Sequence, residues 1–344
     1  MEITIATVDR KIFTKDMLLK TLYKCLTNND TLLIDFSPEG SSAEALGLYS
    51  LLDNFCDTTN YPKSNITIKT ANMIERHAEY NIIRDPYCWY EIRAIQKWLT
   101  GKTISTGKFP GKHFANFSSR TNWSRLWIAT ILDQYYNDKT IQTYHYDLTR
   151  ENYNHNKYTG LDDLIRHNCD LYVEAAKFIQ SCPRTLDLEY LQDLKNQDNT
   201  LFHHIDSYYP IQHPSNLNLL QYYHDIFVDI VVEPNVSGNS FLVTEKLWRS
   251  IIARRPFIVM SNHNYLVNLK RLGFRTFDNY WDESYDNCKE GDRILKIQGI
   301  LEQIATWTIP ELNTKLIDMQ DILEHNVTVF ANLSPSKVSE AFNE

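Results

Sequence analysis

The sequence predicts an α/β protein built from two domains, each with a parallel sheet. Short apolar runs typical of buried strands alternate with longer stretches in which apolar residues recur at helical spacing. The chain has 344 residues, which is long for one domain and comfortable for two. A hydrophobic content of 43%, with 12% aromatic residues, supports packed cores and argues against disorder.

The first third of the chain, expected to be one domain over residues 1–105, alternates strands and helices. The expected strands and helices cover residues 3–8, 15–27, 31–36, 43–55 and 65–69. The strand at 31–36 is followed by a turn, Ser-Pro-Glu-Gly, which places Glu39 at the carboxyl edge of a sheet. Catalytic carboxylates are commonly presented there, so Glu39 is a candidate catalytic residue. Its alternative role is to cap the turn.

A second acidic group follows in residues 70–81. Glu75, His77 and Glu79 lie within about one turn if this run is helical. A histidine beside carboxylates can be tuned as an acid or base near neutral pH, so these residues are the next candidates for catalysis. Structural packing or solvent exposure of the histidine is the alternative.

The second domain is expected over residues 106–310, after a linker at 98–112 that is rich in turn residues. A strand at 112–118, a helix at 123–136 and a strand at 140–146 open it. Polar and cationic residues lie at the junction of the first strand with the helix, where Arg120 and Arg125 stand. Arginine suits phosphate binding because its planar fork bonds two oxygens at once. An arginine exposed on a helix surface is the alternative.

Further along, two more helices are expected near residues 170–180 and 186–195. A buried strand then ends at Glu233, which with Thr244 is a candidate ligand-binding residue, and 234–239 is a loop with turn residues throughout. The order continues with a helix, a strand at 256–260 and a helix at 265–272, which Gly273 closes in a left-handed cap. Helix, buried strand and helix in this order form half of a doubly wound domain.

The helix that begins after Thr244 is the part of the chain most informative about chemistry. Thr244 can cap it, and four apolar residues share one face: Leu247, Trp248, Ile251 and Ile252. Its N-terminus lies just beyond a strand end, where free amide groups and the helix dipole favour a diphosphate. Lys246 adds a positive charge there, and Glu245 can accept two hydroxyls of a sugar. The alternative is that Glu245 and Lys246 are ordinary surface charges.

The run FLVTEKLWR at 241–249, followed by PFIV at 256–259, resembles the donor-binding motif of the α-1,3-fucosyltransferases. Residues 269–286, with LGFRTF and DESYD, are similar to uncharacterised glycosyltransferase-like proteins of bacteriophages and large viruses. The likeness covers residues 240–286 and is weak elsewhere. It implies two Rossmann-like domains facing each other across a cleft, the arrangement called GT-B.

The resemblance also assigns roles to residues. It implies that Glu245 and Lys246 contact a nucleotide sugar, and that Arg125, with Arg120 as the alternative, contacts the donor diphosphate. It implies that Glu39 is the general base, although a proline here replaces the glycine that precedes this glutamate in the family. By analogy, residues 311–344, in the region of the last expected helices, cross back to the first domain.

Several function classes are disfavoured. A net charge of −8 argues against a protein that holds long duplex DNA, and six scattered cysteines without a C-x-x-C pair argue against zinc knuckles and disulfide frameworks. No nucleotide-binding glycine motif or G-x-S-x-G is present. The DESYD run at 282–286 lacks the spacing of a calcium loop, so we expect no metal. Without an apolar run of eighteen residues or a signal sequence, a cytoplasmic protein with no membrane association is expected.

These observations predict a glycosyltransferase that moves a sugar from a nucleotide diphosphate to an acceptor hydroxyl, without a cofactor or metal. The resemblance implies inversion at the sugar carbon. Two acceptors stay open, a glycan and a hydroxymethylated base of viral DNA. The alternative function is a non-catalytic module that binds nucleotide sugars or glycans.

Overall fold

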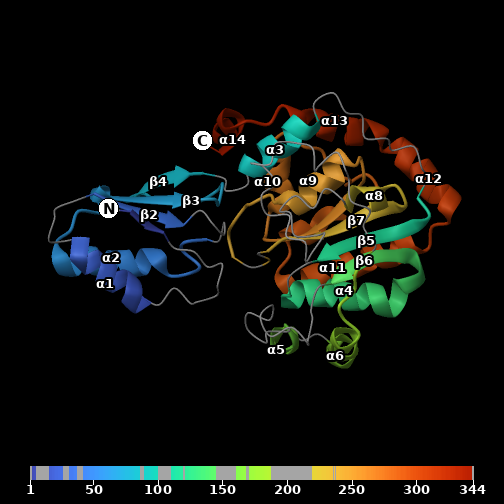
Figure 1. Cartoon of the computed structure of the whole chain (residues 1–344), viewed down its shortest axis with the longest axis horizontal. Helices are drawn as coiled ribbons and strands as arrows, with labels where there is room; N and C mark the ends of the chain where they lie inside the picture. Colours follow the sequence, from blue (N-terminus) through green and yellow to red (C-terminus); the bar gives the residue numbers. More distant parts are fainter. Residues whose placement is uncertain are drawn as a thin grey trace. The chain divides into compact units, whose positions relative to one another are not determined.

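The computed structural model describes residues 2–4, 15–25, 31–36, 42–85, 89–99, 110–118, 121–144, 160–167, 170–186, 219–234, 236 and 238–342. These residues form an α/β protein with two parallel sheets, as the sequence predicts. The chain separates into two compact units (Figure 1). The first comprises Met1–Tyr90, Ser237–Leu242 and Ser334–Glu344, and the second comprises Glu91–Val236 and Val243–Leu333.

The sheet of the first unit has the order β1-β2-β3-β4, and all its neighbouring strands are parallel. Its strands are β1 (Glu2–Thr4), β2 (Leu32–Phe36), β3 (Ile66–Thr70) and β4 (Asn81–Arg84). Two helices, α1 (Lys15–Cys25) and α2 (Leu48–Thr59), cover one face of this sheet, and a short 3-10 helix, Lys63–Asn65, precedes β3 (Figure 1). The core between helices and sheet is apolar, with Leu22, Ile34, Leu52, Ile66 and Ile68 fully buried.

Residues 71–80 differ from the expected helical run, because they form a loop of turns and bends that leads into β4. Two bonds between backbone amides and side chains explain the difference. The Asn72 backbone amide donates to the Thr70 hydroxyl at 3.1 Å, and the Asn72 side-chain Oδ1 accepts the Ile74 backbone amide at 3.3 Å. Side-chain bonds of this kind compete with the backbone bonds of a helix. Glu75, His77 and Glu79 consequently do not share a helical turn.

The sheet of the second unit has the order β6-β5-β7-β8, again with parallel neighbours. Its strands are β5 (Lys112–Ser118), β6 (Thr140–Tyr144), β7 (Ile226–Val232) and β8 (Phe257–Met260). Every residue of β7 and β8 is buried, which confirms that these apolar runs are interior strands.

Helices surround this second sheet. They are α3 (Trp89–Leu99), α4 (Trp123–Tyr136), α5 (Leu161–Arg166), α6 (Tyr172–Gln180), α8 (Leu220–Tyr223), α9 (Glu245–Ile252), α10 (Tyr265–Arg271), α11 (Glu290–Ala305), α12 (Ile309–Asp318) and α13 (Gln320–Ala331). Two 3-10 helices, Asn137–Lys139 and Glu283–Asn287, complete the set. Gly273, just after α10, has φ +93°, so the predicted left-handed cap is confirmed. None of the described helices is both long and apolar enough to cross a membrane.

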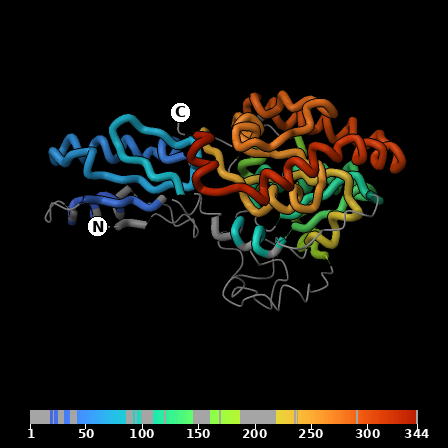
Figure 2. The backbone as a smooth tube through the Cα atoms, turned by 90° about the horizontal axis from the view of Figure 1, so that it is seen from above, coloured from blue at the N-terminus to red at the C-terminus, as the bar shows by residue number. Residues whose placement is uncertain are grey.

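The boundaries of the units fall at other residue numbers than the expected ones, while the last helix of the chain belongs to the first unit, as expected for the C-terminal segment. The first unit ends at Tyr90 rather than near residue 105, and Gln96 of α3 donates to the carbonyls of Phe330 and Leu333 in the second unit. Near the other end of the chain, α14 (Pro335–Phe342) belongs to the first unit. Figure 2 shows it, in red, beside the strands of that unit, where Arg76 and Arg84 donate to the Phe342 carbonyl at 2.8 and 3.1 Å.

Candidate anion-binding site

The two central strands of the second unit, β5 and β7, are parallel neighbours whose connections leave in opposite directions. From β5 the chain passes through α4 to β6 on one side. From β7 it passes through α9 to β8 on the other side, and Figure 1 shows α4 and α9 on opposite faces of the sheet. In doubly wound domains, ligands bind at the carboxyl ends of the strands where the strand order reverses in this way. The first turns of α4 and α9 come shortly after the carboxyl ends of β5 and β7, at this edge of the sheet.

The N-terminus of α4 is built around Asn122. The Asn122 Oδ1 accepts the Arg125 amide and the Ser124 hydroxyl, each at 2.8 Å, which is the geometry of an N-cap. The Asn122 Nδ2 points across to the Pro234 carbonyl, just after β7, at 3.5 Å. Arg125 therefore begins a helix that is tied to the loop between β7 and α9. Its side chain is 5% exposed, so the predicted arginine is buried rather than on the surface.

A close packing contact holds this helix start in place. A Cβ atom added to Gly160 would lie 2.9 Å from both the Asn122 carbonyl carbon and the Trp123 amide nitrogen. Gly160 also has φ +82°, in the left-handed region where glycine is favoured. Beyond it, the His167 ring stacks on the Trp123 indole with centroids 3.9 Å apart. Helix α5, which lies between Gly160 and His167, thus packs against the first turn of α4.

The N-terminus of α9 is capped by Thr244, as predicted. The Thr244 hydroxyl accepts the Lys246 amide at 3.4 Å and donates to the Glu233 carboxyl at 2.6 Å. Glu233 also accepts the Thr244 amide at 3.2 Å and the Tyr265 hydroxyl at 3.0 Å, and it is 1% exposed. Burial raises the pKa of the Glu233 carboxyl above its ordinary value of 4.5. Glu233, a predicted ligand-binding residue, thus holds the start of α9 against β7 and α10.

Glu245 and Lys246 form an ion pair at the mouth of this turn. The Lys246 Nζ lies 2.7 Å from the Glu245 Oε1 and 3.1 Å from the Thr244 hydroxyl. Both side chains are partly buried, with 19% and 13% of their surface exposed. Burial alone would raise the pKa of Glu245, but the positive charges of Lys246 and Arg249 outweigh it, so the pKa lies below 4.5. The Lys246 side chain thus lies over the N-terminus of its own helix.

Behind the first turn of α9 lies a buried polar cluster made of Tyr223, Asp229, Arg249 and Ser250. The Asp229 carboxyl, in the middle of β7, accepts the Tyr223 hydroxyl at 2.5 Å and the Ser250 hydroxyl at 2.7 Å. Burial raises the pKa of Asp229 and, further still, that of Tyr223. The Arg249 Nε reaches the Tyr223 hydroxyl at 3.5 Å. The Arg249 guanidinium therefore lies in the interior, where the negative charges of Glu245 and Asp229 act on it.

The carboxylate candidates of the first unit have structural partners. Glu75 is 5% exposed and accepts three donors, the Tyr49 hydroxyl at 2.8 Å, the Asn72 side chain at 2.7 Å and the Ala43 amide at 3.3 Å. The His77 ring packs against Tyr49 and Tyr80, with centroids 4.3 and 4.8 Å away. Glu75 and His77 are not hydrogen-bonded to each other in this arrangement.

The other two predicted site residues, Glu39 and Arg120, lie outside the described residues.

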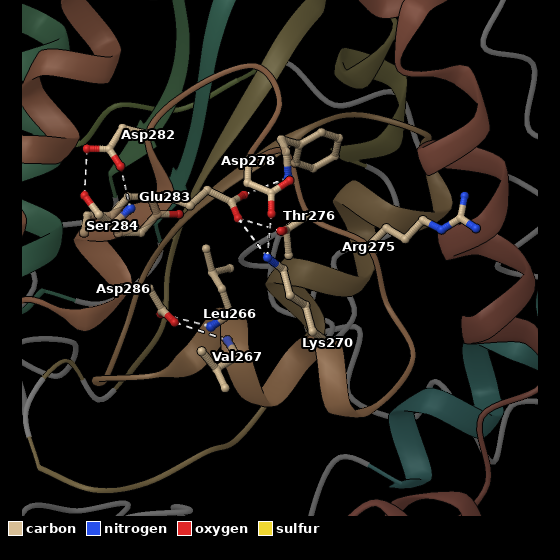
Figure 3. Close-up of polar contacts among 12 residues, drawn as sticks. Leu266, Val267, Lys270, Arg275, Thr276, Asp278, Asp282, Glu283, Ser284 and Asp286 are labelled. Atoms are coloured by element: carbon tan, nitrogen blue, oxygen red, sulfur yellow. Dashed lines mark hydrogen bonds and ion pairs between the residues drawn. The ribbon is translucent and has the colours of Figure 1, made fainter.

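The three carboxylates of the DESYD run face different partners, as Figure 3 shows. Asp282 accepts the amide and hydroxyl of Ser284, and Glu283 accepts the Thr276 hydroxyl at 2.5 Å and the Phe277 amide at 2.7 Å. Asp286 accepts the Leu266 and Val267 amides at the start of α10. In the part of the chain that the structure describes, no group of three or more His, Cys, Asp or Glu side chains is placed to hold a metal ion.

The structure also identifies residues that the sequence reasoning missed. Asn122 has a recognisable signal, because it directly precedes the predicted helix and asparagine is a favoured N-cap. Asn72 and Arg249 have no such signal, since their contacts depend on residues distant in the sequence or on burial. Comparisons with known proteins add no further guide, because no family model, curated protein or solved structure matches the chain.

Proposed function

We propose that the chain is a glycosyltransferase that binds a nucleotide-diphosphate sugar at the carboxyl ends of β5 and β7 in the second unit. One observation carries the proposal: the starts of α4 and α9, with Arg125 and Lys246, border the point where the strand order reverses. A diphosphate there meets a helix N-terminus and two cationic residues. The proposed arrangement of the two α/β units is the GT-B type.

The proposed chemistry follows from the charges at this edge. A departing nucleoside diphosphate accumulates negative charge, which Arg125, Lys246 and the α9 dipole would stabilise without a metal ion. Glu245, once Lys246 turns to the phosphates, has two carboxylate oxygens to accept sugar hydroxyls. In this proposal a carboxylate, with Glu39 as first candidate, deprotonates the acceptor hydroxyl and the sugar carbon is inverted.

The donor site is tested by calorimetric titration of GDP and UDP into the wild type and three alanine variants. Replacing Arg125, Glu245 or Lys246 should weaken binding about ten- to hundredfold, because each removes a charge-assisted contact. Lys270→Ala is the matched control. This lysine lies in the last turn of α10, where it forms ion pairs with Asp278 and Glu283. Nucleotide binding that survives all three changes would remove the basis for the proposal.

The general base is tested separately with Glu39→Gln. Turnover should fall by roughly two to four orders of magnitude while donor affinity is unchanged, since a general base acts in the chemical step. If turnover persists, Glu75→Gln and His77→Gln are the next variants. Glu75→Gln needs a stability measurement beside it, because this carboxyl accepts three hydrogen bonds within the first unit.

A non-catalytic nucleotide-sugar or glycan-binding module is the second candidate function. The specific observation that favours it is the buried, fully bonded state of Glu75, which leaves this carboxyl poorly placed to accept a proton from a substrate. Slow hydrolysis of the donor in the absence of acceptor separates the two, because only an enzyme produces it. Transfer assays with glycans and with hydroxymethylated DNA then distinguish the two acceptor classes.

A further inference from the structure

Arg249 is a buried cation with unusually few partners. It is 2% exposed, its Nε bonds the Tyr223 hydroxyl at a long 3.5 Å, and its Nη1 is buried with no hydrogen-bond partner among the described residues. Buried guanidinium groups are normally bonded throughout. Arg255, 1% exposed in the same unit, shows the usual arrangement, because its nitrogens donate to three backbone carbonyls. Arg249 is therefore placed for something other than local bonding.

The position of Arg249 on α9 relates it to Glu245. The two residues are four positions apart, so they share one face of the helix, and side chains of a helix lean toward its N-terminus. Arg249 thus lies one turn below Glu245 on the same face of α9, close enough for the two charges to act on each other. Its charge favours the ionised form of Glu245, yet the carboxylate's ion-pair partner within the described residues is Lys246, at 2.7 Å.

This arrangement meets a difficulty when an anion binds. The Lys246 ammonium directs two of its three N–H groups to Glu245 and Thr244, so it can give more than one bond to a diphosphate only by releasing Glu245 or Thr244, and we take Glu245 as the bond released. The partly buried Glu245 carboxylate would then lie beside a polyanion without a counter-charge, which is costly. A second cation within reach of Glu245 removes that cost.

We propose that Arg249 is a positioning residue of the nucleotide-diphosphate site, which neutralises Glu245 when Lys246 turns to the diphosphate. The inference rests on the proposed function, because it requires an anion to bind at the start of α9. In the free protein Glu245 pairs with Lys246, and in the complex it pairs with Arg249 from one turn below. Arg249 thereby keeps Glu245 ionised, so that both carboxylate oxygens remain acceptors for sugar hydroxyls.

The charged groups around Glu245 are few among the described residues. Lys246 and Arg249 share its helix, Asp229 and Glu233 lie on β7 and just after it, and Tyr223 lies on α8. Helix α13 also packs on α9, but its Glu324 pairs with Arg254 beyond the opposite end of α9. Lys246 and Arg249 are thus the cations that hold Glu245 ionised.

The proposal predicts a proton linkage that a purely structural arginine would not produce. In Arg249→Met, binding of an anion removes the last cation near Glu245, so the pKa of this carboxyl rises in the complex. Binding then takes up about one proton at pH values between the pKa of the free variant and the raised pKa of the complex, and over that range affinity falls by up to roughly tenfold per pH unit as the pH rises. In the wild type, Glu245 stays ionised and contributes no proton uptake.

Inorganic pyrophosphate is the probe, because it lacks the sugar hydroxyls that Glu245 is proposed to bind. Calorimetric titrations in buffers of different ionisation enthalpy count the protons taken up by the wild type, Arg249→Met, Glu245→Gln and the double variant. The proposal expects extra uptake in Arg249→Met alone, and its loss in the double variant, which has no carboxylate at position 245. Pyrophosphate's own proton exchange is measured in Glu245→Gln and the double variant, which lack a carboxylate at position 245 with and without Arg249.

The titrations distinguish failure of the Arg249 inference from failure of the proposed function. If Arg249→Met binds pyrophosphate with the proton uptake and pH dependence of the wild type, Arg249 does not neutralise Glu245 and the inference is wrong. If Arg249→Met does not fold, the wild type and Glu245→Gln still test it, because a proton taken up by the wild type and not by Glu245→Gln means that Glu245 is protonated on binding. If the wild type binds neither pyrophosphate nor GDP or UDP, the proposed function itself fails.

Discussion

Replacing Thr244 with valine should destabilise the second unit, because this buried hydroxyl serves two partners at once. It accepts the Lys246 backbone amide and, at 3.1 Å, the Lys246 ammonium at the start of α9, and it donates to the buried Glu233 carboxyl at 2.6 Å. Valine keeps the shape of the side chain and deletes only the polar group. The change thus isolates the hydrogen bonds from the packing.

The magnitude follows from two of these contacts. The bond from the Lys246 amide is long, at 3.4 Å, so its loss should cost about 0.5 kcal/mol, the low end for an N-cap. Leaving a carboxyl oxygen of Glu233 buried without its donor should cost about 2 kcal/mol. Together the free energy of unfolding should fall by about 2–3 kcal/mol.

Urea unfolding measures this difference, with amide hydrogen exchange of α9 as the local readout for this helix. Thr244→Ser is the matched control, because serine keeps the hydroxyl, and it should lie much closer to the wild type. The reasoning would be refuted if Thr244→Val unfolded within about 0.5 kcal/mol of the wild type, or if Thr244→Ser were equally destabilised.

Three further predictions test other parts of the structure. Gly160→Ala should lower the unfolding free energy by about 1–3 kcal/mol, since a Cβ at φ +82° would collide with the backbone of Asn122. Thermal unfolding measures this change, and an unchanged midpoint temperature would contradict the close approach of Gly160 to Asn122. Burial raises the pKa of Glu233, so the folded state holds the proton of this carboxyl more tightly than the unfolded state does. The free energy of unfolding of the wild type, measured relative to that of Glu233→Gln, should therefore fall as the pH rises above 4.5. Urea unfolding at a series of pH values tests this. Asn72→Ala should speed hydrogen exchange of the Phe241 amide, which donates to Asn72 at 2.8 Å, and unchanged protection would count against this anchor.

The parts of the site that could be predicted from sequence are those built from local contacts. Thr244 caps α9 through a group two residues away, and the buried face of α9 follows from helical spacing. The apolar runs of β7 and β8 are likewise continuous in sequence. Such features need only neighbouring residues, so a local pattern is sufficient to identify them.

The parts that could not be predicted depend on contacts between distant residues. Glu75 is a residue type that often serves in catalysis, but here it accepts a hydrogen bond from the Asn72 side chain. The same side chain accepts the amide of Phe241, which lies 169 residues further along the chain. The same asparagine turns residues 71–80 into a loop. No periodicity within residues 70–81 contains this information, so the expected helical turn was wrong.

Strand order is the non-local feature on which the proposed site depends most. The starts of α4 and α9, which carry Arg125 and Lys246, lie at the same edge of the sheet because β7 lies beside β5, although β6 comes between them in the chain. Had β7 instead been added beside β6, the connections through α4 and α9 would run in the same direction. Right-handed crossovers would then place both helices on one face, and the reversal of strand order at this edge would not form. The helix starts could be located from sequence, but it is the pairing of β5 with β7 that brings their charges to one edge.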